Sequence, residues 1–287
     1  MAKGRELKGR IRSVENTRKI TRTMEMVATS KMKRAQDRVQ AARPYANSLA
    51  EVIASLYSAD LAERFPLLRQ PVAEKRAAVI LLTSNRGLAG GFNSNLIKEA
   101  RNLLNRLDRD GVETQLHIVG KKGLGYFRYI GRPIASNRID ITDRPTAVNA
   151  SELVDKLIDE FVAGTVDAVY VVYAKFVSAL STPPTSERIL PVTPPANTGA
   201  RPDYLLFPSA EAILTELLPL YVRNSVYRAL VETVAGEQSA RRTAMKNATD
   251  NAGDILNVLR RTYNRARQAQ ITQEIAEIVG GSAALEG

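Results

Sequence analysis

The chain has 287 residues and a formal net charge of +11, and hydrophobic residues make up 44% of it. This length allows one or two hydrophobic cores, and the composition is ordinary for a globular protein. The absence of cysteine excludes disulfides, thiolate catalysis and cysteine–zinc sites. The longest apolar runs, Ala77–Leu82 and Ala168–Ala174, are far shorter than the roughly 20 residues of a membrane-spanning helix.

The first 57 residues predict one long basic helix. They hold 13 Lys and Arg against 5 Asp and Glu. Nucleic acid, an anionic membrane surface or acidic protein loops could each bind such a helix. The basic start resembles a transit peptide, but the apolar repeat continues to Leu56, so we interpret it as mature structure. With an expected register slip at Thr17–Thr21, the repeat consists of Leu7, Ile11, Val14, Ile20, Met24, Val27, Met32, Ala35, Val39, Ala42, Leu49, Ile53 and Leu56.

The middle of the chain, residues 58–208, alternates strand and helix patterns. This alternation predicts a small Rossmann-like α/β domain with a mainly parallel sheet. We expect Asn93 or Ser94 to cap the first helix, and Pro194–Pro208 to be a loop. The expected strands are Ala77–Thr83, Thr114–Val119, Pro133–Ile139, Val166–Lys175 and Ile189–Val192, and the expected helices are Asn95–Arg109, Lys122–Ile130 and Thr146–Ala163.

A second long helix is predicted over Glu211–Val279, with a kink at Pro219. At ~1.5 Å per residue, about 70 residues make a helix roughly 100 Å long, which needs a partner for its apolar stripe. The first and last segments together therefore predict an antiparallel two-helix coiled coil. The expected stripe consists of Ile213, Leu217, Leu220, Tyr227, Val231, Val234, Met245, Ala248, Ala252, Ile255, Leu259 and Ala266.

Residues that could carry chemistry are few. The Gly-rich turn Ser84–Asn93 follows the first predicted strand, but it lacks the spacing of a dinucleotide site or a P-loop. A tight turn that binds nothing is therefore favoured over a nucleotide-dependent enzyme. His117 is the single histidine, and a packed strand residue is favoured over a metal ligand. We expect no catalytic centre, metal or cofactor.

Both long helices carry polar residues where the repeat expects apolar ones. Gln238 and Arg241 fall on the stripe of the last helix, and Arg18, Thr21 and Glu25 fall on that of the first. A local register shift with Arg extending outward would explain each case. The alternative is that an outside partner grips these stretches.

At these positions the sequence resembles the γ subunit of F-type ATP synthase. Its N-terminal helix is matched by Asn16–Thr21, Met24–Ala28 and Ser30–Met32. Its C-terminal helix is matched by 240–241, 244–246, 248–252, 263–264 and 266–268, and its closing signature by 271–275, Glu277 and Gly281. Ser84–Leu88 and Gly90–Asn93 resemble its central turn. Ser282 stands where the family usually has Ala, which is a conservative departure.

The resemblance implies a rotor shaft that is not itself catalytic. Its helices, 1–57 and 209–287, would enter the hexamer of α and β subunits, and the domain 58–208 would contact the ε subunit and the c-subunit ring. The complex would lie on the cytoplasmic face of a bacterial inner membrane, and the plastid dithiol control is absent. A basic coiled coil that binds nucleic acid is the alternative. By match to family positions, the expected β contacts are Met24, Lys31, Gln238, Arg241, Arg267, Gln268, Thr272 and Glu274.

Overall fold

A computed structural model describes residues 2–57, 64–71, 73–193 and 209–286, with side chains from 5 to 281 within those ranges. The expected loop Pro194–Pro208 lies outside the described residues. The chain forms two compact units, a terminal unit of Met1–Ala28 with Arg241–Gly287 and a central unit of Thr29–Ala240. The three-part division suggested by the sequence stays a prediction. No helix in the described ranges has the length and hydropathy needed to cross a bilayer.

The two long helices form as expected. Helix α1 spans Ala2–Leu56, and helix α6 spans Ala210–Glu286 and continues through Pro219. In the terminal unit, Glu15 pairs with Arg260 and Thr21 contacts Thr249. In the central unit, Ala35 and Val39 of α1 pack with Val231 and Ala235 of α6. Because the residue numbers rise along one helix as they fall along the other, the coiled coil is antiparallel.

The buried stripe of α1 corrects the register expected from the sequence. The expected slip at Thr17–Thr21 does not occur, because the stripe follows one uninterrupted 3–4 spacing through Thr21 and Ala28. Ile20 and Val27, which the slip would bury, are 60% and 50% exposed. The sequence reading followed the largest apolar side chains, whereas the helices approach closely enough to bury small ones. The buried α1 positions are Thr21, Ala28, Met32, Ala35, Val39, Leu49, Ile53 and Leu56.

The stripe of α6 is corrected in the same way. Leu220 is 37% and Ile255 is 50% exposed, and both were expected to be buried. Neighbours one or two residues away are buried instead. The 3–4 spacing of buried residues therefore continues through the polar residues Gln238 and Arg241. The buried positions include Leu214, Leu218, Val222, Val226, Val231, Ala235, Gln238, Met245, Thr249, Ala252 and Leu256.

The central unit contains a five-stranded sheet in the order β3-β2-β1-β4-β5. All neighbouring strands are parallel except β4 and β5, which are antiparallel. A mainly parallel sheet is thus confirmed. The strands are β1 (Arg76–Leu82), β2 (Glu113–Val119), β3 (Ser136–Arg138), β4 (Ala168–Ala174) and β5 (Pro184–Leu190).

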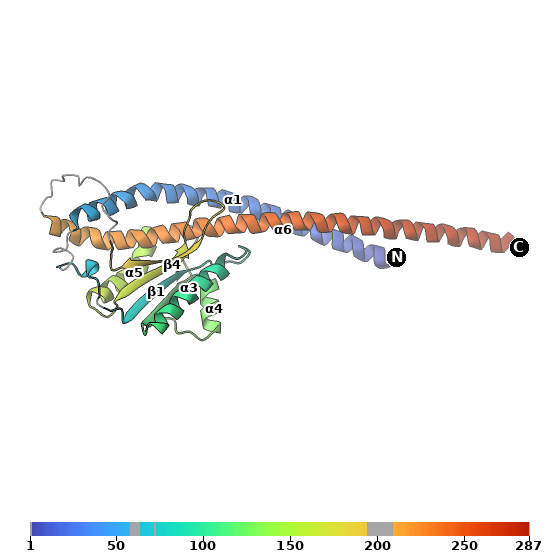
Figure 1. The fold of residues 1–287 in the computed structure, drawn as a ribbon. Helices are drawn as coiled ribbons and strands as arrows, with labels where there is room; N and C mark the ends of the chain where they lie inside the picture. Colours follow the sequence, from blue (N-terminus) through green and yellow to red (C-terminus); the bar gives the residue numbers. More distant parts are fainter. Residues whose placement is uncertain (1, 58–63, 72, 194–208, 287) are drawn as a thin grey trace. The chain divides into compact units, whose positions relative to one another are not determined.

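Helices cover both faces of this sheet. Helices α3 (Phe92–Arg109) and α4 (Lys121–Tyr129) pack on the face that carries Val79 and Leu81. Helix α5 (Ala147–Val162) packs on the face of Ile80 and Leu82, together with the central-unit parts of α1 and α6. Figure 1 shows the two long helices running side by side along this layer. A 3-10 turn, η1 (Pro66–Leu68), adds Leu67 and Leu68 to the core of this layer.

Local signals explain several element boundaries. Thr146 caps α5 through a capping box with Asn149, as its hydroxyl accepts from the Asn149 N–H at 3.3 Å. The expected cap of α3 is wrong, because this helix begins at Phe92 with Gly91 at its cap position. The Asn93 side chain turns back instead, and its Oδ1 accepts from the Ser84 N–H at 3.0 Å. It therefore stabilises the preceding turn rather than the helix end.

Candidate partner-contact surfaces

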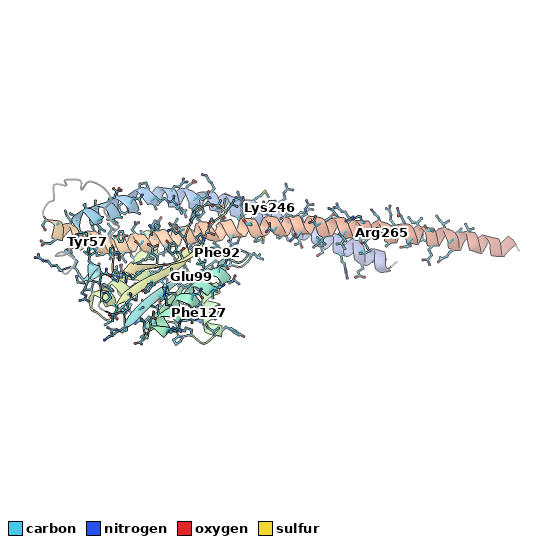
Figure 2. All side chains as sticks on the ribbon, in the orientation of Figure 1. Tyr57, Phe92, Glu99, Phe127, Lys246 and Arg265 are labelled. Carbon is cyan, nitrogen blue, oxygen red and sulfur yellow. The ribbon has the colours of Figure 1, made fainter. Side chains whose placement is uncertain are left out.

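The Gly-rich turn after β1 uses its polar groups internally. The Asn85 side chain accepts from the Lys121 N–H and donates to the Ile139 and Ile141 carbonyls, each at 3.0 Å. Helix α6 also lies against this end of the sheet, since a Cβ built at Gly236 would meet the Phe92 ring at 3.3 Å (Figure 2). In open α/β sheets this is the edge at which ligands bind. Here the long helix occupies that edge, so the turn serves packing.

His117 is a packed residue of β2. Its Nδ1 lies 2.7 Å from the Ser136 hydroxyl of β3, and its Nε2 is buried. Burial lowers the pKa of His117, although the carboxylate of Glu160 acts in the opposite direction. Among the described residues, no group of three or more His, Cys, Asp or Glu is placed to hold a metal ion. The favoured reading of this histidine as a strand residue is confirmed.

The polar residues on the coiled-coil stripe are accommodated inside the chain. The hydroxyls of Thr21 and Thr249 lie 2.8 Å apart, although 228 residues separate them in sequence. Gln238 is 4% and Arg241 is 8% exposed, so both occupy the stripe positions that the sequence predicts. Arg18 is exposed, and its guanidinium lies over Gly253, where a built Cβ would meet it at 3.8 Å. The arginine thus extends outward from the seam.

The eight expected β contacts fall into two groups. Met24 and Lys31 of α1 are half-buried, and Gln238 and Arg241 of α6 are buried. The Lys31 ammonium lies 2.5 Å from the Asp143 carboxylate, and this pairing lowers the pKa of Asp143. The second group lies near the end of α6 and is exposed, and it consists of Arg267, Gln268, Thr272 and Glu274.

The structure places that second group on one face of α6 together with large apolar side chains. In the terminal unit, α6 extends past the N-terminal end of α1 (Figure 1), and every described side chain from Ile271 to Gly281 is exposed. At about 100° per residue, nine exposed residues between Asn264 and Val279 lie within an arc of roughly 160° around α6. We call this surface the tip face, and it comprises Asn264, Arg267, Gln268, Ile271, Thr272, Glu274, Ile275, Ile278 and Val279.

The tip face is both apolar and polar. Ile271, Ile275 and Ile278 are 46%, 56% and 71% exposed. Within the helix, the Thr272 hydroxyl donates to the Gln268 carbonyl at 3.0 Å, and Glu274 accepts from Gln270 at 2.9 Å. A concentrated exposed apolar surface with polar neighbours is typical of a protein interaction site. The sequence reading listed the polar members and missed these isoleucines, whose 3–4 spacing was the available signal.

The basic part of α1 in the terminal unit presents its charge to solvent. Glu6 and Arg10 form an exposed pair at 2.7 Å, which contributes little to stability. Glu15 and Arg260 link the two helices at 2.5 Å. The other basic side chains of α1 in this unit are exposed, so their positive charges are suited to attracting acidic groups. The exposed basic residues are Arg5, Lys8, Arg10, Arg12, Arg18, Lys19 and Arg22.

Leu88 in the Gly-rich turn is a further candidate that sequence reasoning missed. It has a positive φ of 63° and is 62% exposed. Such a conformation is costly for a branched non-glycine residue and is often found at functional sites. Nothing in its sequence context marks it, since the strain and the exposure both depend on how the turn closes against α4.

The chain combines paired terminal helices, an exposed helix end and a central α/β domain. This combination is typical of a stalk-type subunit whose surfaces bind other chains. The ATP synthase family matches residues 3–285. The ATP synthase gamma chain of Gemmatimonas aurantiaca is 66% identical over 290 residues, with 100% of both chains covered. That of Frankia casuarinae is 44% identical, with 98% of this chain and 97% of the relative covered. The chain belongs to the ATP synthase gamma chain family, the non-catalytic rotor subunits of the central stalk.

Solved structures agree with this assignment. The central stalk and c-ring of the Tetrahymena thermophila mitochondrial ATP synthase contain a chain with a TM-score of 0.62 and 26% identity, covering 80% of this chain and 99% of that one. A chain of the Euglena gracilis mitochondrial ATP synthase has a TM-score of 0.67 at 18% identity, covering 99% of this chain and 95% of that one. This second likeness supports the fold alone.

Proposed function

We propose that this chain is the shaft that couples ion flow through a membrane ring to ATP synthesis or hydrolysis at β-subunit sites. The observation that carries the proposal is the pairing of α1 with α6 in the terminal unit, beyond which α6 continues as an exposed helix. A paired helix resists bending and twisting better than a single one. Rotation of such a body can impose different conformations on surrounding subunits in turn.

The partners follow from the family. The solved relatives are parts of assemblies described as central stalk and c-ring, or as OSCP, F1 and c-ring. For this chain we infer α and β subunits around the coiled coil, and the ε subunit and the c-ring at the α/β domain, with one copy per complex. The named relatives with the highest identities are bacterial, which supports a peripheral position on the cytoplasmic face of the inner membrane.

We assign the β contacts principally to the tip face. Arg267 and Gln268 can donate hydrogen bonds to carboxylates, and the neighbouring isoleucines supply apolar area. Thr272 and Glu274 complete this set. Because all four polar residues are exposed, no rearrangement is needed for them to meet a partner.

The other four expected contacts are less accessible in the chain alone. Lys31 would have to exchange Asp143 for a carboxylate of β. Met24 is half-buried and would contact a partner with part of its side chain. Gln238 and Arg241 are buried, and they would reach β only through a change of rotamer. These assignments rest on the family match at each position.

Acidic protein loops are a better partner for the basic helix than nucleic acid. Tyr45 and Tyr57 are the only aromatic residues in the first 57 positions, whereas proteins that bind single strands use several stacking platforms. Duplex DNA titrated at several salt concentrations separates the two possibilities. Tight binding that persisted near 0.2 M salt would favour nucleic acid.

Reconstitution tests the proposed function directly. Purified α and β subunits are mixed with or without this chain, and ATP hydrolysis is measured. We expect the chain alone to be inactive and to stimulate hydrolysis by the mixture. An equal rate from α and β without it would contradict the assignment.

A further inference from the structure

The turn that joins β4 to β5, residues 175–183, packs one half-buried aromatic side chain against residues of both long helices. Phe176 packs against a cluster formed by Ala35 and Val39 of α1 with Val231 and Ala235 of α6. All of these residues belong to the central unit. The α/β domain thus places a ring against a cluster that both helices of the coiled coil form. Elsewhere in the central unit, α6 residues such as Leu218 and Val222 share a core cluster with residues of one sheet face, such as Ile80.

The backbone of the same residue is held by both helices. The Phe176 N–H donates to the Glu232 carboxylate of α6 at 2.8 Å, and the Phe176 carbonyl accepts from Arg43 of α1 at 3.3 Å. Glu232 is only 6% exposed. Burial raises its pKa, while the Phe176 amide and Arg228 act against that rise. A buried carboxylate is costly unless it is hydrogen-bonded or paired, and the Phe176 amide supplies such a hydrogen bond.

Further contacts fix the turn along α6. The Ala174 N–H donates to the Thr233 hydroxyl at 3.4 Å, and the Ser239 hydroxyl donates to the Ala179 carbonyl. Between them Gly236 allows close approach, since a Cβ there would lie 3.1 Å from the Ala174 Cβ. These contacts therefore hold about two turns of α6 against the short segment 174–179 of the sheet domain.

A charged network lies beside this contact. Arg228 of α6 pairs with Glu187 of β5 at 3.1 Å, and the Tyr173 hydroxyl of β4 donates to Glu187 at 2.7 Å. The network and the Phe176 contact occupy the same side of α6. Apolar packing alone resists sliding weakly, whereas directed hydrogen bonds to both helices, together with the packed Phe176 ring, resist both sliding and rotation.

We propose that Phe176, held by Glu232 and Arg43, is the positioning residue that locks the α/β domain rotationally to both shaft helices and so transmits torque between them. This inference rests on the proposed function. The domain is the part assigned to the ring, and the coiled coil is the part assigned to the β subunits. Torque must therefore cross from one to the other inside the central unit.

The test compares two activities of the same reconstituted complex. ATP hydrolysis requires the coiled coil inside the hexamer, whereas ATP-driven ion pumping also requires the domain to turn the ring. For Phe176→Ala we expect the number of ions pumped per ATP hydrolysed to fall at least about twofold. This is the lower end of the effects that single residues have on the coupling between two sites. Glu232→Ala should act in the same direction. Glu232→Gln, which keeps the acceptor oxygen, should retain most of the coupling.

Matched controls separate this effect from general destabilisation. Val177 is the next residue of the turn and is 60% exposed, and Glu216 is an exposed carboxylate on α6. We expect Val177→Ala and Glu216→Ala to keep the wild-type ratio. A variant that merely failed to assemble would lose hydrolysis and pumping together. A wild-type ratio in assembled Phe176→Ala and Glu232→Ala complexes would overturn the inference while leaving the rotor function intact.

Discussion

Thr21 and Thr249 place two hydroxyls 2.8 Å apart inside the coiled coil of the terminal unit. Each hydroxyl also has an acceptor in its own helix, at 3.1 Å for the Arg18 carbonyl and 2.8 Å for the Met245 carbonyl. Neither group therefore depends on the other for a hydrogen bond. The contact between Thr21 and Thr249 therefore shows how the two helices are aligned but contributes little to the stability of the coiled coil.

The first prediction follows from this local satisfaction. We expect Thr249→Val to lower the free energy of unfolding by no more than about 1 kcal/mol, because the Thr21 hydroxyl keeps the Arg18 carbonyl. Thr21→Val with Thr249→Val should be close to wild type, since valine has nearly the same shape and is more apolar. Urea unfolding followed by helical circular dichroism of the full chain measures both. A loss of several kcal/mol in the double variant would show that the hydroxyl pair is essential.

The second prediction concerns Arg267 on the tip face. Arg267→Ala should weaken coupling or assembly, because a donor to β carboxylates is lost. Arg265, labelled on α6 in Figure 2, provides the control, since it is also exposed but lies roughly 160° around the helix from Arg267 at about 100° per residue. An unchanged rate of ion-driven ATP synthesis in Arg267→Ala would remove this residue from the contact surface. Equal losses in both variants would indicate a nonspecific charge effect.

The third prediction concerns the apolar part of the tip face. Ile271→Asn with Ile275→Asn should change the stability of the isolated chain by no more than about 0.5 kcal/mol per site, because both side chains are exposed. Stimulation of hydrolysis in the α and β mixture should nevertheless fall. Ala276→Asn is the control, since Ala276 is exposed but lies outside the tip face at about 100° per residue. Full stimulation by the double variant would argue that these isoleucines meet solvent in the complex.

The fourth prediction concerns the pH dependence that Glu232 confers. Burial raises its pKa above the ordinary value of 4.5, so the folded chain binds this proton more tightly than the unfolded chain. The associated stability is present below the unfolded pKa and is lost as pH rises through the folded pKa. Relative to Glu232→Gln, the wild type should therefore become less stable as pH rises above about 4.5, by at most ~1.4 kcal/mol per pH unit.

Unfolding of both proteins in urea over a pH series measures this difference. The comparison cancels contributions from other titrating groups, such as Asp143, whose pKa is lowered by Lys31. Parallel stability curves for the wild type and Glu232→Gln would show that the Glu232 pKa is the same in both states.

Most elements were predictable because they depend on local patterns. The run 77–82 is apolar on every residue, and such a run forms a strand that is covered on both faces. Thr146 and Asn149 mark the start of α5 through a local capping box. The edge strand was placed poorly, since β5 begins at Pro184 and shares only Ile189 and Leu190 with the expected strand. Its polar residues pair with β4, and that pairing has no local signature.

The register of the coiled coil was the main error, and its cause is physical. Hydrophobic periodicity favours the larger side chains, so Ile20, Val27 and Ile255 were assigned to the seam. Helices in close contact instead bury Ala and Thr and leave some large apolar residues exposed. Exposed isoleucines on a stalk subunit then become candidate partner contacts rather than core.

The sequence by itself determined two long helices, an α/β domain between them and the family, because helical repeats, strand patterns and terminal motifs are encoded by neighbouring residues. The tertiary structure decided which stripe is buried, that Gly236 lets α6 approach the sheet closely, and that Phe176 packs against residues of both long helices. Those features depend on distances between segments up to 228 residues apart, the separation of Thr21 and Thr249. No local pattern records such distances, since they arise only when the helices and the sheet pack together.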